Sequence, residues 1–169
     1  MVGVAVSRER VSDGMEFGVC TTVSEAGILA EAGFSYVEGN VQRDLKPLDD
    51  EDVFQSFLKT AKASPLPVAV ANCFVPGDLK ITGPDADLDK LRTYAAVAFR
   101  RAEKVGIEVI VFGSGGARNI PDGFDRATAW KQLVEFGRMC GPLAEGHGVT
   151  VVVEPLNRGE CNVLNSVGE

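Results

Sequence analysis

The strongest candidate for chemistry in this sequence is a glutamate that follows an apolar run. The run Val149–Val153 is β-branched and uncharged, and Glu154 comes directly after it, at the start of a polar segment. A carboxylate at the end of a buried strand can hold a hard divalent ion or accept and return a proton. We therefore predict that Glu154 is a functional residue. A second interpretation stays open, in which Glu154 pairs with Arg158 and stabilises the loop.

Two more polar residues stand at the ends of apolar runs. Asn72 ends the run Val68–Asn72, and Ser114 comes shortly after Val109–Phe112. Parallel α/β proteins bind their ligands at the carboxyl ends of their strands, so we predict that both residues line a substrate pocket. For Asn72 the alternative is an ordinary turn residue, because asparagine is common in loops.

A glycine-rich segment, Gly113–Gly116, surrounds Ser114. Its backbone N–H groups could approach a phosphate, or its glycines could give the chain a flexible exit from a strand. The nearby Arg118 could recognise an anionic group. We expect Arg118 instead to be a solvated loop residue.

Histidine and cysteine usage argues against several classes of site. His147, the only histidine, precedes Val149–Val153 and is expected on the side opposite Glu154, so we set aside a Ser-His-Asp or Cys-His mechanism built from these residues. The four cysteines are far apart and form no CxxC pair. This spacing argues against a zinc knuckle or a disulfide scaffold and favours reduced thiols.

The elements that must position these residues alternate between short β-rich runs and longer amphipathic segments, the pattern of parallel βαβ units. The predicted strands are Phe17–Thr21, Tyr36–Gly39, Val68–Asn72, Val109–Phe112 and Val149–Val153. Neither a GxGxxG nor a GxxxxGK[ST] loop follows the first run. A barrel is therefore preferred over an open doubly wound sheet.

Four segments show apolar residues at helical spacing. They are residues 24–32, a segment from about Asp50 to just before Pro65, residues 88–105, and a segment from about Trp130 to Ala144. Pro142 is expected to bend or interrupt the last helix, and Trp130 is expected in the core. The connections from strand to helix are longer than those from helix to strand, so irregular residues gather at the carboxyl ends of the strands.

Composition limits the partners of the protein. The chain has 169 residues, 45% of them hydrophobic, which suits one globular domain. A net charge of -7 without a Lys/Arg block predicts repulsion from nucleic acid and anionic membranes, although one local arginine can still bind a small anion. We find no signal-peptide pattern and no apolar run of membrane-spanning length. We expect a cytoplasmic, soluble protein.

Four segments carry a resemblance to a known family. They are Val153–Glu160, its continuation Asn162–Glu169, the strand end Val111–Gly116, and Phe34–Glu38. On these the sequence resembles the sugar phosphate isomerase/epimerase family, the xylose isomerase-like TIM barrels that include ketose 3-epimerases and hydroxypyruvate isomerase. The resemblance implies a parallel (β/α)8 barrel enzyme.

The resemblance also implies roles for two glutamates. The residue that matches Glu154 ligates a divalent ion, Mn²⁺ or Mg²⁺, and is one of two acid/base carboxylates, while the residue that matches Glu160 contacts sugar hydroxyls. The implied reaction is isomerisation or epimerisation of a sugar or sugar phosphate through an enediolate, with a small carbohydrate as the partner. Two alternatives stay open: a metal-dependent endonuclease of the same superfamily, and a non-catalytic half-barrel binding module.

Family members hold the metal with three further side chains from later strands, and full barrels run to about 250 residues. We therefore expect residues 1–169 to form a single incomplete barrel domain of about five β/α units, with the C-terminal half absent and no activity alone. The two open sheet edges of such a half barrel predict self-association.

Overall fold

The fold is built on one parallel sheet. A computed structural model describes residues 14–169. Its five strands are β1 (Gly18–Cys20), β2 (Tyr36–Asn40), β3 (Val68–Asn72), β4 (Val109–Phe112) and β5 (Thr150–Val153). All five predicted strands are confirmed, and no end differs by more than one residue.

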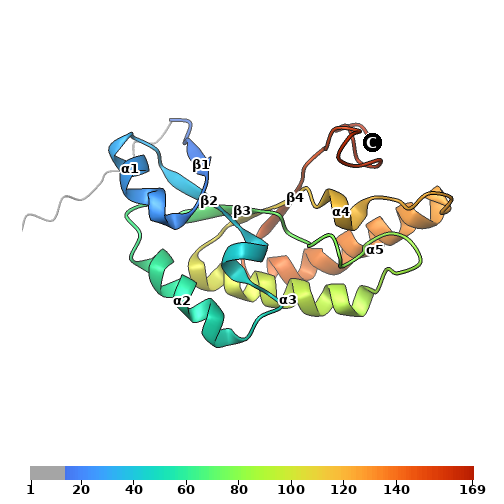
Figure 1. Ribbon diagram of the computed structural model, residues 1–169, viewed down its shortest axis with the longest axis horizontal. Coiled ribbons are helices and arrows are strands. Elements are labelled where there is room, and N and C mark those ends of the chain that lie inside the picture. Colours follow the sequence, from blue (N-terminus) through green and yellow to red (C-terminus); the bar gives the residue numbers. More distant parts are fainter. Residues whose placement is uncertain (1–13) are drawn as a thin grey trace, which may run out of the picture.

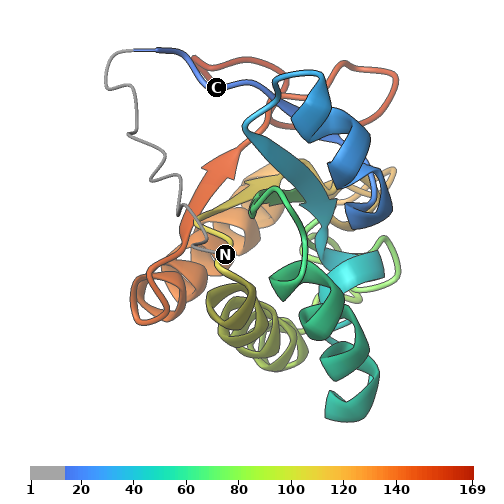
Figure 2. The ribbon, with the colours of Figure 1, turned by 90° about the vertical axis from the view of Figure 1, so that its left-hand side faces the viewer.

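The order of the strands identifies the architecture. The sheet order is β1-β2-β3-β4-β5, and every neighbouring pair is parallel. A doubly wound sheet reverses its strand order at a switch point, whereas a barrel adds each strand beside the previous one. The observed order is therefore that of successive barrel units. Figures 1 and 2 show helices α2, α3 and α5 along the outer face of this curved sheet.

The four predicted helical segments are confirmed, and two short elements are additional. The helical elements are a 3-10 turn η1 (Val23–Glu25), α1 (Ala26–Glu31), a π-helix η2 (Val41–Leu45), α2 (Glu51–Lys62), α3 (Leu88–Val105), α4 (Gly115–Arg118) and α5 (Arg126–Glu145). Sequence periodicity misses η2 and α4 because each spans little more than one turn. Among the described residues, no helix is long and apolar enough to cross a membrane.

Helix α5 runs through Pro142 without interruption, so of the two expected effects only a bend stays a prediction. Pro142 lies in the last turn, where its own carbonyl still accepts a hydrogen bond from the N–H of Gly146 at 3.1 Å. The helix ends at Glu145, as the glycine at 146 predicts. Gly106 ends α3 in the left-handed conformation, at φ 98°, where glycine carries no steric penalty.

Aromatic packing joins the sheet to the two long helices. Phe74, just after β3, lies 5.3 Å from Phe99 of α3 and 6.1 Å from Phe136 of α5, measured between ring centroids. Phe136 in turn lies 5.2 Å from Phe112 of β4. Such contacts add about 0.5–1.5 kcal/mol each beyond the burial of area. This cluster fixes β3 and β4, and with them the loops that leave their carboxyl ends.

The long connections leave the carboxyl ends of the strands, as expected. Residues 73–87 join β3 to α3, and residues 113–125 join β4 to α5, whereas residues 106–108 and 146–149 suffice for the return paths. Aspartates cap the helices that follow the long loops. Asp87 accepts from the N–H of Lys90 at 3.1 Å, and Asp125 accepts from the N–H of Thr128 at 2.7 Å.

Candidate active site at the carboxyl ends of β3, β4 and β5

Three of the four predicted site residues lie at one edge of the sheet. Asn72 is the last residue of β3, Ser114 is the second residue after β4, and Glu154 directly follows β5. Because Phe112 and Val153 are register partners, the ends of β4 and β5 are level. Parallel strands thus bring these side chains to a common rim, the position at which such folds bind ligands.

Glu154 is exposed and its backbone continues the sheet. Its N–H donates to the carbonyl of Phe112 at 3.2 Å. Its carboxylate lies over Gly113, in the space that a Cβ at that position would occupy. Within the described residues no ion pair joins Glu154 to Arg158. The interpretation of Glu154 as a loop-stabilising partner of Arg158 is therefore wrong.

Cys73 shares this rim. Burial is the main cause that raises the pKa of the Cys73 thiol, and the charges of Cys20 and Glu154 raise it further. Cys73 is also one of the few non-glycine residues at positive φ, 52°. Asn72 donates to the Sγ of Cys20 at 3.0 Å, which ties the end of β3 across β2 to the end of β1. The Oδ1 atom of Asn72 is buried and has no partner among residues 14–169.

Ser114 uses its hydroxyl to join two loops. Its Oγ accepts a hydrogen bond from the N–H of Val75 at 2.9 Å, and its own backbone is left-handed at φ 42°. The hydroxyl proton remains able to donate, as a serine both donates and accepts. Its role in substrate binding stays a prediction.

Glu160 occupies a different hollow. It lines a space of about 430 Å³ together with Lys80, Thr82, Asp85 and Asn119, between the β3–α3 loop and helix α4. Its carboxylate accepts a hydrogen bond from the side chain of Asn157. Glu160 therefore belongs to the loop after β5 and lines a hollow to which Glu154 does not contribute. Its contact with sugar hydroxyls also stays a prediction.

The glycines of the β4–α4 segment are explained by packing. A Cβ on Gly113 would overlap the Oε2 atom of Glu154, and a Cβ on Gly115 would come within 3.0 Å of the carbonyl oxygen of Glu160. A Cβ on Gly116 would come within 3.2 Å of the Cα of Gly77. Each glycine thus lets another segment approach closely. Their placement requires neither a bound phosphate nor flexibility.

Arg118 differs from its prediction. We expected a solvated loop arginine, but its side chain is fully buried beneath the segment that follows β5. The cause is the short helix α4, which turns residue 118 inward, where its guanidinium donates to the carbonyl of Glu154 at 2.8 Å. The sequence gives no periodic signal for a helix of four residues, so this burial was not predictable from pattern.

Three rim residues were missed at first. Cys20 and Cys73 have exposed thiols at the ends of β1 and β3, and Arg43 of η2 donates to the carbonyl of Thr21 at 3.0 Å and pairs with Asp44 at 2.7 Å. Both cysteines stand at the carboxyl ends of strands, as Asn72 does, so their position in the sequence already marks them as rim residues. His147, as expected, lies at the opposite edge, with its Nδ1 2.8 Å from a carboxylate oxygen of Glu103.

The donor set at the rim does not complete a metal site. Among residues 14–169 no group of three or more His, Cys, Asp or Glu side chains is arranged to hold an ion. Mg²⁺ and Mn²⁺ prefer about six oxygen ligands, of which Glu154 supplies one or two. The described residues therefore do not fit a complete metal centre.

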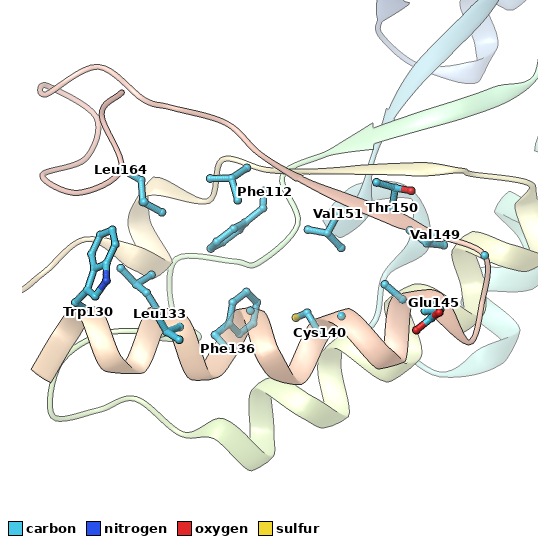
Figure 3. Close-up of a pocket in the computed structure, with 16 residues that line it drawn as sticks. Phe112, Trp130, Leu133, Phe136, Cys140, Glu145, Val149, Thr150, Val151 and Leu164 are labelled. Carbon is cyan, nitrogen blue, oxygen red and sulfur yellow. The ribbon is translucent and has the colours of Figure 1, made fainter. Parts of the chain in front are cut away.

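A large apolar cavity lies on the helix-facing side of the sheet. It measures about 670 Å³ between α5 and the helix-facing side of β5, and Figure 3 shows Phe136 and Cys140 of α5 on one side and Phe112 and Val151 of the strands on the other. Trp130 at its end is 38% exposed, so its predicted place in the core is wrong. The reason is that, in the described part of the chain, no element covers this side of α5. The lining is almost wholly apolar and offers no carboxylate beyond Glu145.

Comparison with known proteins supports the architecture. The D-psicose 3-epimerase of Clostridium cellulolyticum H10 superposes with a TM-score of 0.71 at 19% identity, over 90% of this chain and 56% of its own. A sugar phosphate isomerase/epimerase of Parabacteroides distasonis gives 0.58 at 13% identity, over 90% and 55%. An AP endonuclease, family 2, of Brucella melitensis gives 0.64 at 24% identity, over 88% and 57%. At these identities the likeness shows the fold, and this chain spans just over half of each.

No curated protein sequence matches the chain. The sequence model of one family does, across residues 27–169, which include all the candidate site residues. The strand order, the helices on the outer face and these matches agree on the fold predicted from the sequence. The chain belongs to the xylose isomerase-like TIM barrel family.

Proposed function

We propose that this chain is part of an enzyme that isomerises or epimerises a sugar or a sugar phosphate through an enediolate. The observation that carries the proposal is the position of Glu154, an exposed carboxylate at the carboxyl end of β5, on the rim where barrel enzymes place their catalytic groups. The structural likeness to a D-psicose 3-epimerase supports a carbohydrate as substrate.

In this proposal Glu154 moves the proton. Its carboxylate takes a proton from the carbon next to the substrate carbonyl, which leaves an enediolate, and a second carboxylate returns a proton. Return to the opposite face gives an epimer, and return to the neighbouring carbon gives an isomer. Asn72 and Ser114 line the same rim and would hydrogen-bond the sugar, and Glu160 would contact its hydroxyls. At its position over Gly113, Glu154 is exposed at the rim.

We also propose Glu154 as one ligand of a divalent ion, Mn²⁺ or Mg²⁺, whose general contribution would be to polarise the oxygens of a ketose. The other ligands and the second carboxylate would come from outside the described residues, which do not complete such a site. In this proposal residues 1–169 form an incomplete barrel domain that is inactive alone. The open edges of β1 and β5 support self-association, with another copy or with a separate barrel half.

Endonuclease activity is the second candidate, because one structural neighbour is an AP endonuclease. The net charge of -7 disfavours it, since binding to a phosphate backbone depends on clustered Lys and Arg. A non-catalytic binding module is the third. Neither alternative uses the position of Glu154 as directly as proton transfer does.

The test is solvent exchange. The product of the complete gene is incubated with Mn²⁺ and a panel of ketoses and ketose phosphates in D2O, and NMR follows deuterium at the carbon next to the carbonyl. The proposal predicts metal-dependent incorporation with at least one ketose. Absence of exchange across the panel, together with metal-dependent cleavage of DNA at abasic sites, would replace the proposal with the endonuclease.

A further inference from the structure

Arg118 is the most deeply buried charged side chain of residues 14–169, with 0% of its surface exposed. It ends the single-turn helix α4, below the loop that follows β5. In the described part of the chain no carboxylate pairs with it. Burial of a cation is costly unless its donors are hydrogen-bonded. The acceptors of the Arg118 hydrogen bonds therefore show which segments it connects.

Three backbone carbonyls accept from the two terminal nitrogens, whereas Nε is buried and has no partner among residues 14–169. Nη1 donates to Phe112 at 3.0 Å, and Nη2 donates to Glu154 at 2.8 Å and to Leu164 at 3.4 Å. The guanidinium also lies over the Phe112 ring, 5.4 Å from its centroid. One side chain thus joins the end of β4 to both ends of the loop between Glu154 and Leu164.

The consequence falls on Glu154. Its N–H is bonded to the carbonyl of Phe112 and its C=O to Arg118, so both sides of its Cα are fixed. A fixed Cα determines where the side chain can reach, and the carboxylate reaches the space above Gly113. We infer that Arg118 is a positioning residue for Glu154: by joining the carbonyls of Phe112, Glu154 and Leu164, its guanidinium holds the carboxylate at the rim.

The geometry requires arginine and not merely a positive charge. A guanidinium presents five N–H donors in a rigid plane, whereas a lysine ammonium is a compact point charge on a flexible stem. R118K therefore keeps the charge but loses the bridge. R118M removes both with a side chain of similar length. The two variants separate charge from geometry.

Arg101 provides the matched control. It is 2% exposed and likewise donates to backbone carbonyls, those of Leu45 at 2.9 Å and Asp49 at 2.9 Å, and to the carboxylate of Glu51. It holds the segment between η2 and α2, which contains none of the rim residues after β3, β4 or β5. R101M thus removes a buried arginine of the same kind from a different place.

The experiment is amide hydrogen exchange on this chain. R118K and R118M should accelerate exchange at residues 154–165 about tenfold or more relative to wild type, because each loses charge-assisted hydrogen bonds, and should leave 41–51 unchanged. R101M should do the reverse. Unchanged exchange at 154–165, or equal acceleration throughout α3, would overturn the inference. So would failure of both Arg118 variants to fold while R101M folds.

The effect on turnover rests on the proposed function, and it is read separately. In the active enzyme R118K should lower kcat about a hundredfold with KM little changed, because misplacement of a reacting group costs rate more than binding. R101M should keep both constants. If the wild type incorporates no deuterium into a ketose, the proposed function fails. Amide hydrogen exchange at residues 154–165 still decides the role of Arg118. Equal kcat for wild type and R118K in an active enzyme would contradict the positioning role.

Discussion

The carboxylate of Glu154 occupies the space above the Cα of Gly113, so that a Cβ at residue 113 would overlap its Oε2 atom. This contact links the exits of two adjacent strands. The obstructing atom is the end of a flexible side chain and not backbone, so a larger residue at 113 would move the carboxylate and leave the sheet in place.

G113A should therefore separate activity from stability. We expect the free energy of unfolding to change by no more than about 1 kcal/mol, because only a flexible side chain must move. Turnover should fall about a hundredfold, since a displacement of about 1 Å at a reacting group is costly. Denaturant unfolding and ketose kinetics measure the two effects.

G27A is the matched control for that substitution. Gly27 lies in α1, and a Cβ there meets nothing within 4 Å. Alanine should stabilise the helix by up to about 1 kcal/mol and leave turnover unchanged. Unaltered turnover in G113A would mean that the position of the carboxylate on Gly113 does not matter for catalysis.

Glu51 should make stability depend on acid. Hydrogen bonds from Arg100 and then Lys104 lower its pKa from the ordinary value of 4.5 to about 2. A carboxyl with a depressed folded-state pKa stabilises the fold above its unfolded value, and that contribution disappears as the pH falls from 4.5 towards 2. Because Glu51 is 38% exposed, solvent screening limits the contribution to about 1 kcal/mol.

The measurement compares E51Q with wild type by urea unfolding at pH 6 and pH 3. The difference in unfolding free energy between the two proteins should shrink at the lower pH. E31Q, which removes an exposed carboxylate at the end of α1 outside this cluster, controls for the change in net charge. A constant difference between E51Q and wild type at both pH values would exclude the cluster as a source of acid sensitivity.

Thiol labelling should distinguish the rim from the core. Cys20 and Cys73 are exposed, whereas Cys140 and Cys161 are buried, and burial raises the pKa of Cys140 to about 12. Iodoacetamide at pH 8 should label the first two in the native protein, Cys73 slowly because its pKa is raised, and all four in denaturant, since the thiolate is the reactive form. Peptide mass spectrometry reads each site. Native labelling of Cys140 would contradict the packing of α5.

Two aromatic residues of α5 should differ in their effect on stability. Phe136 is 2% exposed and packs on Phe74 and Phe112, whereas Trp130 is 38% exposed at the end of the apolar cavity. F136A should lower the unfolding free energy by about 3–5 kcal/mol. W130A should cost at most about 1–2 kcal/mol, because less of its surface leaves water on folding. Equal losses would mean that Trp130 is buried in solution.

The sequence pattern predicted the strands and long helices well, because several residues at regular spacing mark each of them. Residues 68–71 and 109–112 are apolar throughout, as strands covered on both faces must be, and α3 shows its buried stripe over five turns. Residues that follow such strands could be assigned to the rim from their position at the carboxyl end alone. That is why Asn72, Ser114 and Glu154 were found together.

Pattern failed where position depends on contacts distant in sequence. The burial of Arg118 depends on carbonyls up to 46 residues away, and α4 is too short to show a period. Trp130 carries the spacing of a core residue, but whether its stripe is covered depends on what packs beside β5.

The central claim is that Glu154 transfers the proton, and the most direct test compares wild type, E154Q and E160Q in the product of the complete gene. With Mn²⁺ and a ketose substrate in D2O, wild type should incorporate deuterium next to the carbonyl, and E154Q should do so about a thousandfold more slowly with unchanged folding. E160Q should chiefly raise KM, as loss of a binding contact does. Deuterium incorporation by E154Q at the wild-type rate would contradict the account.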